Sequence, residues 1–562
     1  MSSESFLPPG ARNQTSVFAV HGADPEVLAY AMAKYSRSAL SMRESLAEIS
    51  AQRAEQFLNT FYFQYGHRSI ADLAHIAFAV ERLSLLAAIV LVDEQRWDGQ
   101  ERSTRYQNFL KSGWFFPDFA GHAEPAQLYA KTIENLFAAY QRVTAAVFEA
   151  LRRRVPCPAA LKPDAYERTL KARAFDVARY LLPLATNTSL GQIVSARTLE
   201  TQVSRLLSHP AAELRDLGLK LRDAATGPAW NVNAQAGATL VEKLAALEKL
   251  ASVKGTGFSP YINQPETAGA LAPEGSLAAE AAGLLTREVR TAPTLVKYAQ
   301  ANDYAIQTQA ELTQAAAEIL AQIPSETLPH AVVDLVERTE TLEVELASTL
   351  LYSAAHHPYR QIRDLVAQLP AARVSEIVEL GLRHRGRHDE ALRAFQAGAA
   401  LRFDILMDIG GFRDMHRHRR CTQIIQPLTT LHGYEIPTSC DFGSEDEGGY
   451  IDILIEAYCR GDFLSAIEAA HAASAQIAAS PAPEAAQSAL YLLPLATRIR
   501  SLFKMDFAEA QYIIELRSGP AGHFSYRRVA WEMFLALQRQ HPALARSIRV
   551  TDFTKPIDLL QR

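Results

Sequence analysis

The sequence predicts an α+β fold in which helices dominate and which occurs twice in tandem. Three observations carry this prediction: the length of the chain, a heptapeptide that occurs twice, and hydrophobic patterns that mostly have a helical period. At 562 residues the chain can form about three or four domains. Its content of 48% hydrophobic and 21% charged residues is that of an ordinary globular protein, which excludes a disordered or collagen-like chain.

The heptapeptide YLLPLAT is the strongest sign of a duplication, because it stands at 180–186 and again at 491–497. Seven matched residues are far more than average amino-acid usage produces by chance. Other landmarks recur in the same order, namely a Tyr-Ser pair (35–36, 352–353) and an apolar helix leading to a charged cluster (78–96, 403–420). We predict two copies of one fold, at 16–228 and 290–562, joined by a linker region at 229–289.

Helical periods run through most of the chain. Apolar residues at helical spacing predict a long helix over 126–153, which Pro156 and Pro158 end. Short alternating segments are the strand candidates, and they lie at 16–20, 75–80 and 401–406. Glycine and proline interrupt every apolar period between 255 and 275, which is typical of a linker.

Charge and cysteine content exclude several classes of function. The net charge of −5 gives no basic excess for binding nucleic acid or an anionic membrane. The four cysteines lie far apart, so neither a disulfide framework nor a zinc site is indicated. The N-terminus lacks the pattern of a secretory signal, and the apolar stretch at 83–92 is about half of a membrane span. We therefore expect a cytoplasmic protein without a metal site.

Two clusters could bind phosphate. The segment MHRHRR at 415–420 presents arginine forks that match phosphate oxygens, so it could hold a pyrophosphate or a flavin. A solvated cluster is the plain alternative, and no nearby acid completes a metal site with His416 and His418. The first copy has Asp93-Glu94-Gln95 at the equivalent place, followed by Ser103-Thr104-Arg105-Tyr106. Ser103 and Arg105 suit a phosphate monoester, with a helix-end salt-bridge cluster as the alternative.

These motifs resemble those of the flavin-dependent thymidylate synthases. That family has a Gly-His-x-Ser segment, then an Arg-His-Arg motif and then Ser-x-Arg-Tyr. The first copy has Gly66-His67-Arg68-Ser69 and the later Ser-x-Arg-Tyr, but Asp93, Glu94 and Gln95 replace Arg-His-Arg. The second copy keeps Arg417-His418-Arg419 and loses the later motif. The two copies thus lose complementary parts of the pattern.

The resemblance implies a role for each matching residue. It implies that Arg517 activates the uracil in catalysis, with Arg205 as a weaker counterpart in the first copy. The implied nucleotide-binding residues are Glu101, Ser103, Arg105, Tyr106 and Arg179. The implied FAD-binding residues are His67, Ser69, Arg417, His418, Arg419 and His523. Cys421, beside the Arg-His-Arg motif, has no identifiable base, so we expect a packing or solvent-facing thiol and not a nucleophile.

The complementary losses lead us to expect a composite site between the two copies. The resemblance implies FAD-dependent methylation of dUMP to dTMP there, with methylenetetrahydrofolate as carbon donor and NADPH as reductant. Family members are homotetramers with sites between subunits, which implies a homodimer of this longer chain and favours sites that take their halves from two chains. The alternative is a non-catalytic or altered-substrate relative that binds a flavin or a nucleotide.

Overall fold

The computed structural model describes most of the chain, with gaps. The described residues are 24–34, 68–106, 108–110, 112–230, 242–246, 290–296, 299–321, 323, 332–337, 340–386, 392–395, 401–442, 451–546 and 548–560. They belong to two compact units. The smaller unit comprises 1–76, 195–200 and 221–298, and the larger comprises 77–194, 201–220 and 299–562. The boundaries predicted for the two copies stay a prediction.

In the smaller unit, α1 (Pro25–Lys34) begins with Glu26 in its first turn. The Glu26 carboxylate accepts the backbone N–H groups of Thr294 and Leu295, both at 2.8 Å. This unit also contains η2 (Arg68–Leu73). The strand predicted at 16–20 lies outside the described residues.

Within the described residues, two sheets share one strand order. The first sheet has the order β1 (His75–Ser84), β3 (Asn187–Ser195), β2 (Asp98–Glu101). The second has the order β5 (Leu401–Asp408), β9 (Arg498–Met505), β6 (Thr422–Ile425), with β4 (Val333–Leu335) added beside β5. Asp98 pairs with Ile193 in the first sheet, and Thr422 pairs with Lys504 at the equivalent place in the second.

Equivalent helices follow equivalent strands. Helix α4 (Leu85–Leu91) follows β1 as α15 (Ile409–Met415) follows β5. Helix α7 (Ala196–Leu207) follows β3 as α19 (Phe507–Ser518) follows β9. The predicted α+β fold and its tandem duplication are confirmed, and so are the strands predicted at 75–80 and 401–406.

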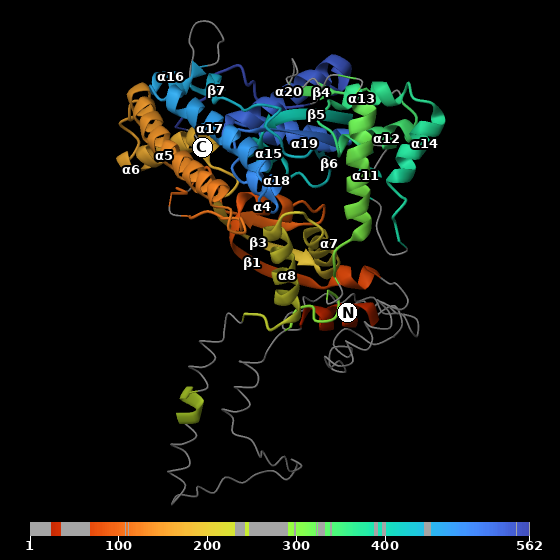
Figure 1. Cartoon of the computed structure of the whole chain (residues 1–562). Helices are drawn as coiled ribbons and strands as arrows, with labels where there is room; N and C mark the ends of the chain where they lie inside the picture. Colours follow the sequence, from red (N-terminus) through yellow and green to blue (C-terminus); the bar gives the residue numbers. More distant parts are fainter. Residues whose placement is uncertain are drawn as a thin grey trace, which may run out of the picture. The chain divides into compact units, whose positions relative to one another are not determined.

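The predicted long helix is α5 (Ala123–Arg154), which ends before Pro156 as expected. It packs against α6 (Pro163–Ala178) and against α17 (Arg460–Ala478) of the second copy (Figure 1). Leu136 on α5 and Ile467 on α17 belong to the same buried hydrophobic cluster. A single core therefore runs through elements of both copies.

The two YLLPLAT segments pair with each other. Each donates backbone N–H groups to the other, and exchanging the two copies maps each hydrogen bond onto an equivalent one. The bonds run from Leu184 to Leu493 (2.9 Å), from Ala185 to Tyr491 (2.8 Å), from Leu495 to Leu182 (2.9 Å) and from Ala496 to Tyr180 (3.0 Å). The repeated heptapeptide is thus the seam at which the two copies meet.

The remaining helices and short strands complete the described fold. Around the second sheet, α11 (Asp303–Leu320), α12 (Leu342–Tyr352), α13 (Tyr359–Val366) and α14 (Ala371–Leu380) contribute to a second hydrophobic cluster. The other elements are η3 (Arg179–Leu181), α8 (Ala212–Thr226), η4 (Arg393–Phe395), β7 (Thr438–Ser439), η5 (Cys440–Phe442), β8 (Ile451–Asp452), α16 (Ile453–Glu456), α18 (Ala485–Leu490), α20 (Phe524–Gln540) and α21 (Pro542–Ala545).

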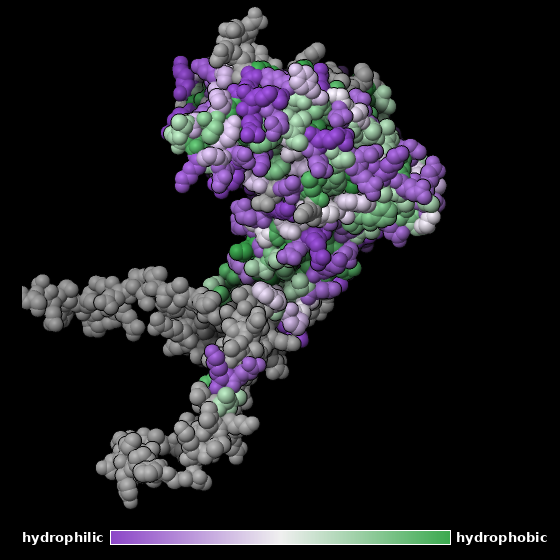
Figure 2. All heavy atoms as spheres, turned by 90° about the vertical axis from the view of Figure 1, so that its left-hand side faces the viewer, coloured by the Kyte–Doolittle hydropathy of each residue, from purple (hydrophilic) through white to green (hydrophobic). Residues whose placement is uncertain are grey.

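One face of the described surface mixes polar and apolar residues. On the face drawn in Figure 2, hydrophilic and hydrophobic residues are interspersed. No helix within the described ranges combines the length and the apolar character needed to cross a membrane.

The seam predicts a stability test. Leu184 and Leu495 are fully buried, so Leu184→Ala and Leu495→Ala should each cost about 2–5 kcal/mol of stability. Each should lower the midpoint of a single calorimetric transition. The exposed Leu431 provides the control, because Leu431→Ala should shift the midpoint little. Separate transitions, with only one affected by each substitution, would show that the copies do not depend on this seam.

Candidate functional site

Residues of both copies meet around Tyr526, on α20. Arg105, after β2, donates to the Tyr526 hydroxyl at 2.9 Å, and its guanidinium lies 5.8 Å from the ring centroid. Arg517, in the last turn of α19, lies 5.4 Å from the centroid of the same ring. Its Nε donates to Nε2 of His418 at 2.7 Å. Arg105 of the first copy's Ser-x-Arg-Tyr motif and His418 of the second copy's Arg-His-Arg motif are thus connected within one chain through Tyr526 and Arg517.

Arg105 is held by a buried ion pair. Its Nε and Nη2 donate to the two oxygens of Asp176 at 2.7 and 3.2 Å, and Nη2 also donates to the carbonyl of Ala521 at 3.2 Å. Burial opposes the charge, but Asp176 outweighs burial and raises the pKa of Arg105 above its usual value. The positive charge of Arg105 is therefore largely compensated inside the chain, and its predicted role in binding a phosphate stays a prediction.

The other residues of this predicted nucleotide group lie nearby in different environments. Ser103 is half-buried and its hydroxyl accepts the backbone N–H of Arg105 at 3.2 Å. Tyr106 is exposed, with its ring 5.8 Å from the guanidinium of Arg105. Glu101 forms an ion pair with Arg413 of the second copy.

Arg179 is a buried arginine with unsatisfied donors. Only 1% of it is exposed. Its Nη1 donates to the Thr104 hydroxyl at 3.4 Å and lies 3.6 Å from a carboxylate oxygen of Asp414. Its Nε and Nη2 have no hydrogen-bond partner among the described residues. Unsatisfied buried donors are costly, so this side chain fits an anionic acceptor.

The Arg-His-Arg triplet divides into three environments. Arg417 is exposed and makes no ion pair with a described residue. His418 is buried, and burial together with the neighbouring Arg517 lowers the pKa of His418 to about 3. Arg419 donates to the carbonyls of Val92 (2.6 Å) and Glu94 (3.2 Å) in the first copy. Arg419 is therefore committed to the contact between the copies.

In the equivalent triplet of the first copy, Asp93 and Glu94 form ion pairs with arginines of the same chain, and we call this the closed triplet. Asp93 accepts from Nη1 of Arg393 at 2.5 Å, and Glu94 accepts from Nη2 of Arg205 at 2.7 Å. Burial raises the pKa of Asp93, but Arg393 and other cations outweigh burial and hold the pKa well below its usual value. Burial also raises the pKa of Glu94, against the opposing effect of Arg205. The carboxylates that replace Arg-His-Arg thus bind arginines of the chain itself.

Cys421 lies in the small pocket beside this closed triplet. It is 3% exposed, and its thiol donates to the carbonyl of His418 at 3.0 Å. Burial raises the pKa of Cys421 to about 12, so the thiol stays protonated at neutral pH. This agrees with the packing role and not with a nucleophile.

His523 caps α20 and ties it to the first copy. It is fully buried, its Nδ1 accepts the N–H of Ser525 at 3.2 Å, and its Nε2 lies 2.8 Å from the carbonyl of Asp176. Burial lowers the pKa of His523 well below its usual value. A neutral imidazole with both nitrogens engaged is suited to positioning α20, and its implied contact with FAD stays a prediction.

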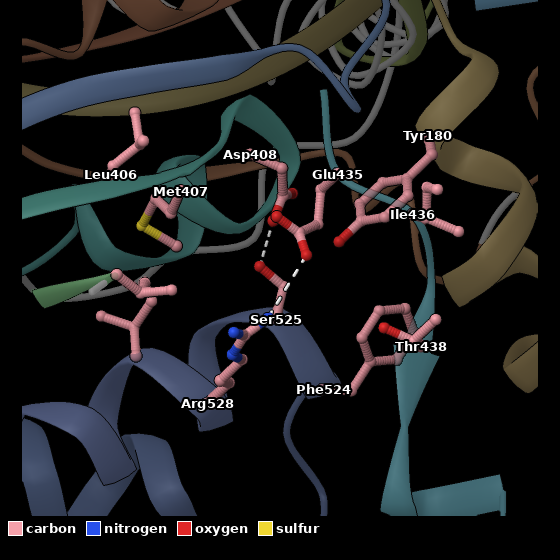
Figure 3. A pocket seen from close by; sticks show the side chains of 12 residues that line it. Tyr180, Leu406, Met407, Asp408, Glu435, Ile436, Thr438, Phe524, Ser525 and Arg528 are labelled. Carbon is pink, nitrogen blue, oxygen red and sulfur yellow. Dashed lines mark hydrogen bonds and ion pairs between the residues drawn. The ribbon is translucent and has the colours of Figure 1, made fainter. Parts of the chain in front are cut away.

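A pocket beside α20 shows a second contact between the copies (Figure 3). Ser525 donates from its hydroxyl to Asp408, and the ring of Tyr180 points toward this pair from the first copy. In the first copy the donor and the acceptor have exchanged places, because Ser84 donates to Glu213 at 2.7 Å. Burial raises the pKa of Asp408 to about 6.

Some predicted residues cannot be placed, and other residues had no signal in the sequence. His67 lies outside the described residues, and so does the side chain of Ser69. Asp176 and Tyr526, which hold Arg105, were not predicted, because neither stands in a motif. Among the described residues, no group of three or more His, Cys, Asp or Glu side chains could hold a metal ion.

Comparisons with known proteins place this geometry in context. The sequence model of a family described as thymidylate synthase complementing protein matches residues 19–226 and 335–543, one match in each predicted copy. A UPF0159 protein of Chlamydia muridarum is 25% identical over 560 residues, covering 94% of this chain and 91% of that protein. A UPF0159 protein of Thermoplasma acidophilum is 24% identical over 553 residues, covering 93% and 94%.

Among solved structures, the chain is similar to a flavin-dependent thymidylate synthase of Helicobacter pylori, a structure complexed with FAD and dUMP. The identity is 18%, the match covers 36% of this chain and 89% of that one, and the TM-score is 0.22.

Asp408 predicts a pH dependence of stability. Its pKa in the folded chain, about 6, lies above the ordinary value of 3.8, so folding favours the protonated carboxyl. Relative to low pH, the fold therefore loses about 3 kcal/mol as the pH rises from about 4 through 6. Asp408→Asn should remove this loss. Melting temperatures at pH 4 and pH 7.5 measure it, with the exposed Asp98→Asn as control. An equal pH dependence in wild type and Asp408→Asn would contradict the assignment.

Proposed function

The chain belongs to the thymidylate synthase complementing protein family, and from this premise we propose that it methylates dUMP to dTMP in an FAD-dependent reaction. We place the reaction at a composite site built from both copies of one chain, and this proposal replaces the expectation that each site takes its halves from two chains. The observation that carries this proposal is that Arg105 of the first copy and Arg517 of the second copy both contact Tyr526. Arg517 also donates a hydrogen bond to His418.

The nucleotide side of the site is assigned to the first copy. Arg179 supports this, because its Nε and Nη2 are buried donors without a partner among the described residues. A phosphate accepts several such hydrogen bonds at once. We propose that Ser103 and Arg105 bind the same phosphate, and that Asp176 fixes the position of the Arg105 guanidinium.

The flavin side is assigned to the second copy. Arg417 is the member of its triplet that is exposed, so it is the residue we expect to contact an anionic group of FAD. When bound, FAD supplies the hydride chemistry of the reaction. NADPH and methylenetetrahydrofolate as co-substrates, a homodimer and a cytoplasmic location stay predictions.

Arg517 is proposed to stabilise negative charge on the uracil ring. A fixed cation acts most strongly where charge develops in a site shielded from water. Arg517 is half-buried, and its Nε is held by a neutral imidazole, so its positive charge is not cancelled by that contact. Tyr526 contacts both Arg105 and Arg517, so we propose that it helps to position the two guanidinium groups.

A second candidate function is a relative that binds a flavin or a nucleotide without turnover. The buried ion pair between Arg105 and Asp176 favours it, since a compensated arginine attracts a phosphate less strongly. The closed triplet at Asp93 and Glu94 favours it as well. The first test below separates the two functions.

Tritium release from 5-labelled dUMP, with FAD, methylenetetrahydrofolate and NADPH present, tests turnover. Arg517→Ala should lower kcat by roughly a hundred- to a thousandfold, because it removes a group that stabilises the transition state. Arg179→Ala should weaken dUMP binding by roughly ten- to a hundredfold, because it removes charge-assisted hydrogen bonds. Wild-type protein that binds dUMP and releases no tritium would support the binding relative.

A further test concerns the flavin. Arg417→Ala should lower the FAD content of the purified protein and leave the melting temperature nearly unchanged, because Arg417 is exposed. Arg419→Ala should instead lower the melting temperature, because Arg419 bonds to the carbonyls of Val92 and Glu94. Flavin absorbance and a thermal melt of each variant measure the two effects. Full FAD content in Arg417→Ala would overturn the assignment of this residue.

A further inference from the structure

The two copies hold equivalent arginines in different ways. In the first copy, Arg205 donates from Nε (3.0 Å) and Nη2 (2.7 Å) to the carboxylate of Glu94. In the second copy, Arg517 donates from Nε to Nε2 of His418 at 2.7 Å. Glu94 and His418 are the middle residues of the two equivalent triplets, and the two arginines correspond with a shift of one position. The same contact is therefore an ion pair in one copy and a neutral hydrogen bond in the other.

The other guanidinium nitrogens of the two arginines also differ, because those of Arg205 are engaged by described residues and those of Arg517 are not. Nη1 of Arg205 donates to the carbonyl of Val90 at 2.6 Å, so all three nitrogens of Arg205 are engaged. The two Nη groups of Arg517 make no hydrogen bond to a described residue, and no carboxylate of the described chain lies within ion-pair distance of them. Glu509 is the acid beside this contact, and it lies 3.8 Å from Nδ1 of His418.

His418 is neutral, which is consistent with a hydrogen bond to Arg517 that leaves the charge of the arginine uncancelled. Nε2 accepts the N–H of Arg517, so it carries no proton and the imidazole is neutral. Burial and the nearby Arg517 lower the pKa of His418 to about 3, which keeps it neutral at physiological pH. A neutral acceptor fixes the direction of the guanidinium and leaves its charge uncancelled, whereas a carboxylate cancels it.

We propose that the middle residue of each triplet decides whether its arginine can bind an external anion. Glu94 forms an ion pair with Arg205, and this internal anion prevents Arg205 from binding an anion of a ligand. His418 holds Arg517 by Nε and leaves both Nη groups to an anionic oxygen of a ligand. His418 is therefore a positioning residue that acts through Arg517, and each chain presents one such arginine.

This inference rests on the proposed function only for the identity of the ligand, an oxyanion of the nucleotide or of its uracil. The difference between the two arginines follows from contacts within the chain, namely those of Arg205 with Glu94 and Val90 and that of Arg517 with His418. It can therefore be tested without any turnover.

Arginine labelling with phenylglyoxal, mapped by mass spectrometry on the full chain, tests the inference directly. Arg205 and Arg517 are both half-buried, so the reagent can reach both side chains, and the response of each to substitution of its partner reports the effect of the pairing. In the wild type, Arg517 should be labelled several-fold faster than Arg205. His418→Glu should reduce the labelling of Arg517 to the level of Arg205. His418→Gln, which keeps a neutral acceptor, should leave it nearly unchanged.

The reciprocal change is Glu94→Gln, which should raise the labelling of Arg205 several-fold and leave Arg517 as it was. This variant keeps the test decisive if His418→Glu does not fold. Equal labelling of both arginines in the wild type, or no response of Arg205 to Glu94→Gln, would overturn the inference.

A parallel titration with dUMP separates this inference from the proposed function. His418→Glu should weaken dUMP binding at least tenfold, and His418→Gln should restore most of it. If labelling follows the predicted pattern while neither the wild type nor any variant binds dUMP or releases tritium, the inference stands and the proposed function fails. If dUMP turnover is found and labelling does not follow the pattern, the inference fails alone.

Discussion

The backbone pairing of the two YLLPLAT segments is the contact on which the rest of the larger unit depends. It joins 180–186 to 491–497 by hydrogen bonds that exchange when the copies are exchanged. Arg179 immediately precedes the first segment, so the seam places it against Asp414 of the second copy. Asp176, three residues earlier, reaches His523 at the start of α20. The backbone pairing is thus symmetric between the two copies, whereas the side chains that it positions differ between them.

The asymmetry is one of charge. The first copy has placed carboxylates where the second keeps Arg-His-Arg, and these carboxylates bind Arg393 and Arg205. These ion pairs are half-buried, and a charge is tolerated away from water only when it finds a partner, because an unpaired buried charge costs several kcal/mol. The carboxylates that replace the first copy's Arg-His-Arg motif therefore have a structural role, because they form ion pairs with arginines of the same chain. In the second copy the middle residue of the triplet is the neutral His418, which accepts from Arg517 and leaves its charge uncancelled.

The duplication, the long helix α5 and the strands β1 and β5 could be predicted, because repeats and hydrophobic periods are local signals. The side-chain pairs could not. Arg105 and Asp176 are 71 residues apart, and neither residue type reveals that both become buried. The motif assigned Arg419 to the flavin, but a motif does not say that its guanidinium bonds to Val92 and Glu94. Family resemblance names residues, and only packing shows which of them are already engaged.

The central claim is that one chain supplies both halves of the site. The most direct measurement mixes two inactive variants, Arg179→Ala in the first copy and Arg517→Ala in the second, by co-expression with different tags and isolation of the mixed assembly. If each site is built within one chain, every site lacks one half and tritium release from 5-labelled dUMP stays at the level of the single variants. If the halves come from different chains, one site is intact and about half of the wild-type activity per assembly returns. The account predicts no recovery, and recovery would contradict it.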